Sequence, residues 1–123
     1  MSYRTFVPKR GDLIHMNFSP SAGHEMAGRH YALVISHDTY SRESGMAIVC
    51  VITSRIRGYP YEVPVPLGLL PDKKDVGRVS SVVIADSVRQ VDYREREAEF
   101  VTTAPESLVE RVFDCLYTAI EKH

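Results

Sequence analysis

The chain has 123 residues, of which 44% are hydrophobic and 25% are charged, so we expect residues 1–123 to form one domain around a single core. Its formal net charge of −1 argues against a protein that coats nucleic acid by charge alone. The sequence has neither a run of eighteen apolar residues nor a secretory leader, which predicts a cytoplasmic protein without a membrane span. Its two cysteines are expected to be buried and reduced.

The first two predicted strands flank a loop that is rich in reactive side chains. Residues 12–18 alternate between apolar and polar, which indicates a half-buried strand, and residues 31–36 are more continuously apolar and therefore more central. Between them, residues 23–30 hold a carboxylate, a guanidinium and two imidazoles. Loops that bring functional groups to the edge of a rigid sheet have this composition, and a solvated turn is the alternative.

Further short strands follow, and they predict a small β-protein. Residues 37–45 indicate a polar loop with one helical turn after Asp38. The remaining predicted strands are 46–52, 61–66, 79–84, 88–91 and 99–102. The two prolines of 61–66 cannot donate ladder hydrogen bonds and place this strand at an edge. Short strands at roughly ten-residue spacing indicate a strongly bent antiparallel sheet or barrel.

One helix is predicted at the C-terminal end, over residues 105–121. Thr103 and Glu106 have the spacing of a capping box, with a proline near the first turn. Apolar residues recur at helical spacing at positions 108, 109, 112, 113, 116, 117 and 120. We expect this whole stripe to be core, with the helix closing the open side of the barrel and not protruding from it.

The common motifs of nucleotide, dinucleotide and zinc chemistry are absent from the sequence. Isolated pairs of possible metal ligands occur at His37 with Asp38 and at Asp72 with Asp75, and we interpret both as solvated surface. We therefore assign no metal and no cofactor.

The polar side chains that remain cluster in two places along the chain. They are Glu25, Arg29 and His30 in the first loop, and Thr53, Ser54, Arg55 and Arg57 after the third apolar strand. A proton acceptor, an arginine and a hydroxyl are the groups needed to cleave a phosphodiester without a metal. RNA supplies its own nucleophile, the 2′-OH. A phosphate-binding module without chemistry and an ordinary charged rim are the alternatives.

Several linked motifs also resemble a known family. They are Arg10-Gly11-Asp12-Leu13-Ile14, Phe18-Ser19-Pro20 with Gly23-His24-Glu25 and Ala27-Gly28, Ala32-Leu33-Val34-Ile35-Ser36, Ile52-Thr53-Ser54 with Arg57-Gly58-Tyr59-Pro60, Ile84-Ala85-Asp86 with Val88-Arg89, and Asp92-Tyr93-Arg94. Together they resemble the MazF/PemK family of toxin endoribonucleases, the mRNA interferases. The resemblance implies an SH3-like β-barrel homodimer, sequence-selective cleavage of single-stranded RNA (mRNA) without metal, and neutralisation by a cognate antitoxin protein.

The resemblance places the catalytic threonine of the family on Thr53 and its loop glutamate on Glu25. Members usually carry Arg-Pro directly before the second strand, where this chain has His30-Tyr31, and its arginine stands one position earlier at Arg29. Either Arg29 or His30 therefore binds the phosphate. The sequence favours Arg29, because a guanidinium stays charged and grips two phosphate oxygens at once.

We assign RNA contacts to six further residues: Ser19, His24, Ser54, Arg55, Arg57 and Asp86. Because the arginine stands one position earlier than in other members of the family, two functions other than RNA cleavage stay open. One is a non-catalytic toxin of the same fold that binds a protein target, as the gyrase poisons of the CcdB type do. The other is a degenerate family member that only binds its antitoxin.

Overall fold

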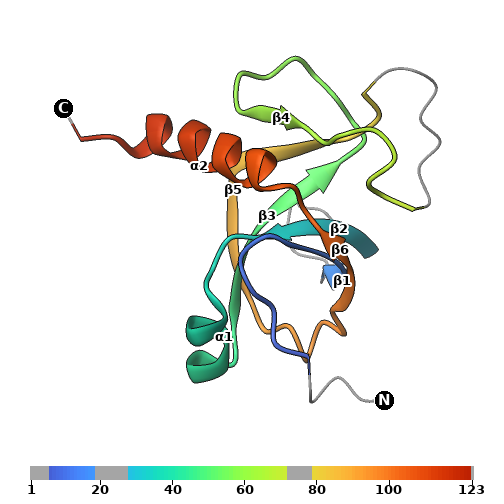
Figure 1. Ribbon diagram of the computed structural model, residues 1–123, viewed down its shortest axis with the longest axis vertical. Coiled ribbons are helices and arrows are strands. Elements are labelled where there is room, and N and C mark those ends of the chain that lie inside the picture. Colours follow the sequence, from blue (N-terminus) through green and yellow to red (C-terminus); the bar gives the residue numbers. More distant parts are fainter. Residues whose placement is uncertain (1–5, 19–27, 72–78, 123) are drawn as a thin grey trace.

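One antiparallel sheet dominates the chain, in a computed structural model that describes residues 6–18, 28–71 and 79–122 (Figure 1). Its strands are β1 (Asp12–Phe18), β2 (Gly28–Val34), β3 (Ala47–Thr53), β4 (Glu62–Pro64), β5 (Val82–Val91) and β6 (Glu99–Thr103). They lie in the order β4-β5-β3-β2-β1-β6, with all neighbours antiparallel. The mainly-β prediction is confirmed, and the proline-containing β4 does lie at an edge.

The sheet curls strongly without closing into a complete ring. The guanidinium of Arg89 in β5 lies 5.3 Å from the ring centroid of Phe18 in β1, although β3 and β2 lie between these strands in the sheet. A register shift between Cys50 and Ile52, where β3 pairs with β5, marks the irregularity that bends the sheet. In the described part of the chain the edge strands β4 and β6 are not paired with each other.

Strand β5 is longer than predicted. We expected two strands, 79–84 and 88–91, on either side of residues 85–87, and this was wrong. Asp86 and Ser87 continue the strand, because β3 pairs with β5 on both sides of them, at residues 82–83 and again at residues 88–91. The turn-forming composition is overridden by pairing on both sides of the interruption.

Helix α1 (Asp38–Ser44) occupies most of the predicted polar loop. An ion pair between Asp38 and Arg42, four residues apart at 3.0 Å, supports it on the exposed face and holds the pKa of Asp38 below its usual value. The helix ends where Gly45 adopts a left-handed conformation with φ of 75° and donates its N–H to the Ser41 carbonyl at 2.9 Å. The segment therefore forms more than the single helical turn that we expected.

Helix α2 (Glu106–Ile120) agrees with the predicted helix to within one residue at each end. The predicted capping box does not form, because Pro105 is the N-cap residue and no side chain caps the helix. Thr103 still belongs to β6, where it pairs with Asp12. No helix in the described residues is long and apolar enough to cross a membrane.

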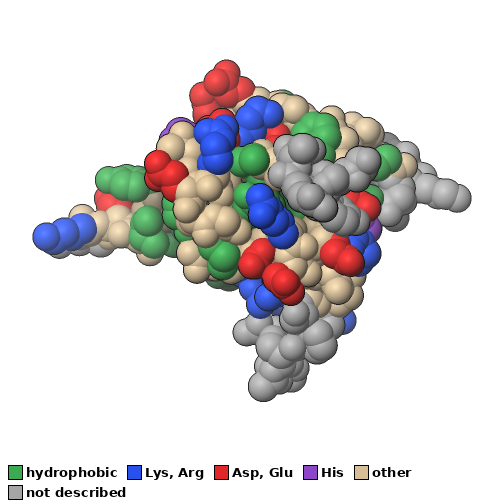
Figure 2. Space-filling view, turned by 90° about the horizontal axis from the view of Figure 1, so that it is seen from below, with side chains coloured by type: hydrophobic (Ala, Val, Ile, Leu, Met, Phe, Trp, Pro, Cys, Tyr) green, Lys and Arg blue, Asp and Glu red, His purple; other side chains and the backbone are tan. Residues whose placement is uncertain are grey.

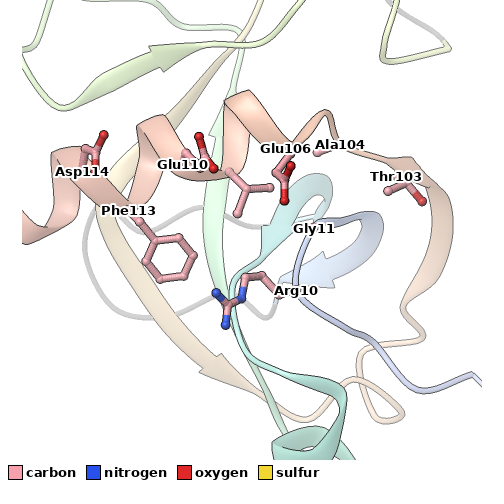
Figure 3. Close-up of a pocket in the computed structure, with 9 residues that line it drawn as sticks. Arg10, Gly11, Thr103, Ala104, Glu106, Glu110, Phe113 and Asp114 are labelled. Carbon is pink, nitrogen blue, oxygen red and sulfur yellow. The ribbon is translucent and has the colours of Figure 1, made fainter.

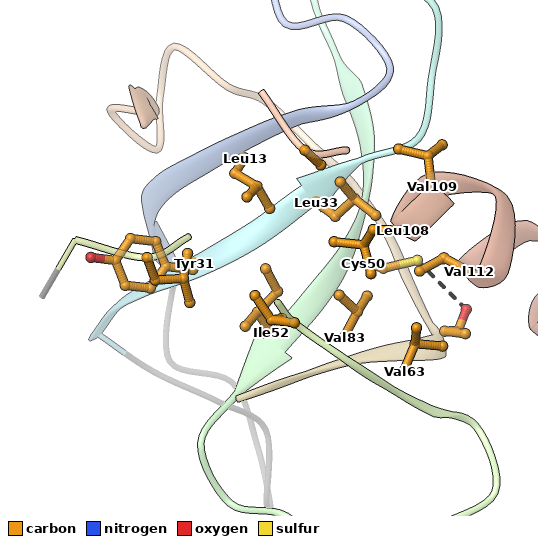
Figure 4. Close-up of a cluster of buried hydrophobic side chains, with 14 residues drawn as sticks. Leu13, Tyr31, Leu33, Cys50, Ile52, Val63, Val83, Leu108, Val109 and Val112 are labelled. Atoms are coloured by element: carbon orange, nitrogen blue, oxygen red, sulfur yellow. Dashed lines mark hydrogen bonds between the residues drawn. The ribbon is translucent and has the colours of Figure 1, made fainter. Parts of the chain in front are cut away.

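Two hydrophobic clusters lie on opposite faces of the sheet. The first lies between the sheet and α2 (Figure 4) and contains Leu13, Tyr31, Leu33, Cys50, Ile52, Val63, Val65, Leu70, Val83, Ala85, Ala104, Leu108, Val109 and Val112. The second fills the inside of the curve and contains Ile14, Met16, Phe18, Ala32, Val34, Ala47, Val49, Val51, Val91, Tyr93 and Ala98. Both cysteines are free. Burial raises the pKa of the Cys50 thiol to about 12, whereas Cys115 is only half-buried.

Only the first half of α2 packs on the sheet. Leu108 and Val112 are buried, Phe113 is half-buried, and Tyr117 and Ile120 are 62% and 68% exposed. The helix extends past the edge of the sheet, and hydrophobic side chains remain uncovered on the projecting part (Figures 1 and 2). The prediction that the helix caps the barrel without protruding is therefore wrong for its C-terminal half.

Candidate functional site

The decisive local feature is that Arg29 and His30 both lie within β2 and not in a loop. Successive side chains of a strand point to opposite faces of the sheet. Arg29 pairs with Asn17, and His30 pairs with Met16, which belongs to the cluster inside the curve. A one-residue offset between the two candidates therefore places them on different faces, with no loop to absorb the difference.

Arg29 is held by acidic and carbonyl oxygens of neighbouring strands. Its Nη2 donates to the Glu99 carboxylate at 3.3 Å and to the carbonyls of His15 and Glu97 at 3.1 Å each. The Glu97 carboxylate lies 4.0 Å from Nη1. The positive charge of Arg29 is thus matched by two carboxylates within the same chain.

His30 lies on the inner face of the curve. Its ring centroid is 5.9 Å from that of Phe18, which is almost completely buried. Ala32 pairs with Val51 in these antiparallel strands. Strand alternation therefore assigns His30, two residues before Ala32, and Thr53, two residues after Val51, to this same face. The register therefore groups the histidine, and not the arginine, with the hydroxyl of Thr53.

A pocket of about 160 Å³ lies beside the start of β2 and the end of β3. Its lining contains residues from both faces: His15, Arg29, His30, Tyr31, Ile52, Thr53, Ser54 and Ser81. Four of the predicted site residues therefore meet here, namely Arg29, His30, Thr53 and Ser54. Sequence reasoning missed His15, Tyr31 and Ser81. In the observed register His15 pairs with Tyr31, and Tyr31 shares a face of β2 with Arg29.

The segment from Ser54 to Tyr61 leaves the pocket and is fixed along its length. The Thr53 hydroxyl accepts the N–H of Arg55 at 3.0 Å, and the carboxylate of Glu62 accepts the N–H groups of Arg57 and Gly58, each also at 3.0 Å. Its backbone is therefore held at Arg55 and again at Arg57 and Gly58. The predicted RNA contacts Arg55 and Arg57 lie on this segment, outside the pocket.

Asp86 does not line the pocket. It accepts a hydrogen bond from the Tyr59 hydroxyl at 2.5 Å, and this bond raises the pKa of Tyr59. The Cys115 thiol lies 3.8 Å from the neighbouring Pro60 carbonyl, so this contact is on the α2 side of the sheet. Three other predicted residues, Ser19, His24 and Glu25, lie outside the described residues.

A second, larger pocket of about 460 Å³ lies between α2 and the start of β1 (Figure 3). Phe113 lies on its wall, with the Arg10 guanidinium 5.2 Å from the ring centroid, and Glu106 and Glu110 lie along the helix. None of the predicted site residues lines it. Among the described residues, no group of three His, Cys, Asp or Glu side chains comes together as a set of metal ligands.

Comparison with known proteins decides the family. Residues 9–120 match the model of the PemK-like, MazF-like toxin of type II toxin–antitoxin systems. The chain belongs to this family. It is 36% identical over 104 residues to the endoribonuclease toxin MazF of Escherichia coli K12, covering 84% of this chain and 86% of the relative.

Solved structures of this toxin family have the same fold. A crystal structure of MazF from Deinococcus radiodurans aligns with a TM-score of 0.81 and 38% identity, covering 95% of this chain and 99% of that one. A crystal structure of MazE-MazF from the same organism aligns with a TM-score of 0.79 and 38% identity, covering 96% and 100%. The curled sheet with its C-terminal helix is therefore the MazF fold, in agreement with the predicted SH3-like fold class.

Proposed function

We propose that this chain is the toxin of a type II toxin–antitoxin pair and that it cleaves single-stranded RNA as an endoribonuclease in the cytoplasm. The endoribonuclease names of its relatives support the reaction class, and crystal structures of MazE-MazF complexes support an antitoxin as partner. The observation that supports the proposal is that His30 and Thr53 line one pocket and, by the register of β2 and β3, belong to one face of the sheet.

The proposed reaction needs only the RNA and side chains of this chain. The 2′-oxygen of one nucleotide attacks the adjacent phosphorus, and Glu25 accepts the proton of the 2′-OH. The Thr53 hydroxyl donates a hydrogen bond to a non-bridging oxygen, where negative charge grows in the phosphorane. His30 contacts the phosphate and gives a proton to the leaving 5′-oxygen. The products are a 2′,3′-cyclic phosphate and a 5′-hydroxyl.

Incubation of the purified chain with single-stranded RNA in EDTA should produce fragments with these two kinds of ends. A matched duplex should remain largely intact, since its base edges are not open to a shallow groove. Thr53→Ala is the inactive reference, and Glu43→Gln on exposed α1 is the active one. Intact RNA with the parent chain, together with normal binding of an antitoxin, would favour a non-catalytic toxin or a degenerate member.

We further propose that two copies associate through the projecting half of α2. Leu116 is half-buried and Tyr117 and Ile120 are exposed along one helix, which leaves an apolar strip of the kind that interfaces cover. Light scattering after gel filtration should report a dimer for the parent and a monomer for Ile120→Asp, because a buried unpaired carboxylate opposes association. A dimeric Ile120→Asp chain would locate the interface elsewhere.

A further inference from the structure

The carboxylate of Glu62 is placed to control the backbone that follows Thr53. Glu62 is the first residue of β4 and pairs with Ile84 of β5, so its own backbone is fixed by the sheet. Its side chain turns back toward the preceding segment, where Oε2 accepts the N–H of Arg57 and Oε1 accepts the N–H of Gly58, each at 3.0 Å. Hydrogen bonds to an ionised acceptor are the strong kind, and two of them at one carboxylate fix two consecutive peptide groups.

The segment that Glu62 holds has little packing to keep it in place. Every residue from Ser54 to Pro60 is exposed, so the path of the chain depends on hydrogen bonds more than on hydrophobic contacts. The turn also contains Gly58 in a left-handed conformation, with φ of 77°. Of the contacts that reach this segment from outside it, the Tyr59–Asp86 bond holds it by a side chain, whereas Glu62 holds its backbone.

The other end of the same backbone determines how the Thr53 hydroxyl can act. The oxygen of that hydroxyl accepts the N–H of Arg55 at 3.0 Å. A hydroxyl group has one hydrogen to donate and two lone pairs that accept. With one lone pair taken by the Arg55 N–H, the hydroxyl hydrogen points away from the segment. Thr53 lines the pocket, so this arrangement leaves its hydrogen available to a group that binds there.

We propose that Glu62 is a positioning residue for Thr53. The carboxylate fixes the N–H groups of Arg57 and Gly58, the fixed backbone holds the N–H of Arg55 against the Thr53 oxygen, and the Thr53 hydrogen is thereby directed toward the phosphate. Glu62 itself touches neither the RNA nor the reacting atoms. This inference rests on the proposed RNA cleavage and adds to it a residue that acts from the edge of the sheet.

Glu62→Gln is the variant that tests the inference. Glutamine has nearly the same size and keeps one acceptor oxygen, but its NH₂ group faces one of the two backbone N–H groups and cannot accept from it. The single-turnover rate at saturating RNA should fall roughly 10–100-fold, because the Thr53 donor is displaced from the growing charge. Val65→Ala is the matched control. It truncates a buried side chain near the same edge, lowers stability, and should leave the rate unchanged below its melting temperature.

A sulfur substitution in the RNA shows whether the loss passes through Thr53. One phosphorothioate diastereomer at the cleavage site places sulfur, a poor hydrogen-bond acceptor, opposite the Thr53 hydroxyl. The parent and Val65→Ala should cleave this diastereomer about tenfold more slowly than the other. In Glu62→Gln the difference should largely disappear, because the bond to Thr53 is already lost. A lower rate that keeps the full difference, or an unchanged rate, would overturn the inference.

Amide resonances test the same connection without any reaction. In ¹⁵N-labelled protein the Arg55 amide should shift in Glu62→Gln as well as in Thr53→Ala, and it should not shift in Val65→Ala. An Arg55 amide that stays in place while those of Arg57 and Gly58 move would show that Glu62 acts only locally, and the inference would be wrong even if the parent cleaves RNA. Intact RNA with the parent would instead overturn the proposed function, with the Arg55 shift still deciding whether Glu62 fixes the bond to Thr53.

Discussion

His30→Ala is expected to lower the single-turnover rate of RNA cleavage by about 10²–10⁴-fold, which is the usual contribution of a positioned proton donor or acceptor. The reason is geometric, since the register of β2 and β3 groups His30 with Thr53 on one sheet face. The rate should be measured with enzyme in excess and at saturating concentration, so that weaker binding does not contribute. His30→Gln is the matched variant that keeps hydrogen bonding and loses proton transfer.

Arg29→Ala should have a smaller effect on that rate and a larger one on affinity. Its guanidinium is matched by Glu97 and Glu99, so its removal takes away a wall of the pocket and not the phosphate contact. Collapse of the saturated rate in Arg29→Ala, with near-parental cleavage by His30→Ala, would instead assign the phosphate to the arginine. The histidine would then be a structural residue of β2.

Leu108→Ala should lower the free energy of unfolding by about 2–5 kcal/mol, because it leaves a cavity between α2 and the sheet. Phe113→Ala should cost less than this, since that ring is only half-buried and shares its exposed side with Arg10. Urea titrations at one fixed protein concentration give the comparison, with Glu110→Ala as the exposed control on the same helix.

A larger loss for Phe113→Ala than for Leu108→Ala would contradict this order. It would mean that burial of the apolar stripe continues toward the C-terminal end of α2, as the sequence alone predicts, and does not stop where the structure shows exposed side chains. The stripe repeats with helical spacing to residue 120, and periodicity reports an apolar face without reporting what covers it.

Local pattern was sufficient for most elements of the fold and insufficient where tertiary pairing overrides it. Strand β1 and helix α2 were predicted nearly to the residue, since each has a clear periodicity. Strand β5 was divided in the prediction at Asp86 and Ser87, and pairing with β3 on both sides of these two residues keeps the strand continuous. The pattern of apolar and polar residues does not show which strand will pair with β5.

The candidate site was partly predictable for the same reason. Thr53, Ser54, Arg29 and His30 were predicted together and do line one pocket. The sequence favoured Arg29 for its permanent charge and placed it in a loop, whereas Arg29 and His30 both lie within β2, where neighbouring side chains point to opposite faces. Ser81 was not predicted, because a serine at the start of a strand carries no signal until the fold buries its hydroxyl.

The fixed segment between Ser54 and Tyr61 affects how tightly RNA is held. A mobile loop that becomes ordered on binding loses conformational entropy, at roughly 1–2 kcal/mol for each residue whose backbone is newly fixed. Here the Glu62 carboxylate and the Tyr59 hydroxyl hold the backbone before any ligand arrives. We therefore expect the backbone that carries Arg55 and Arg57 to enter an RNA complex already ordered, so that the contacts predicted for these two residues lose little free energy in arranging it.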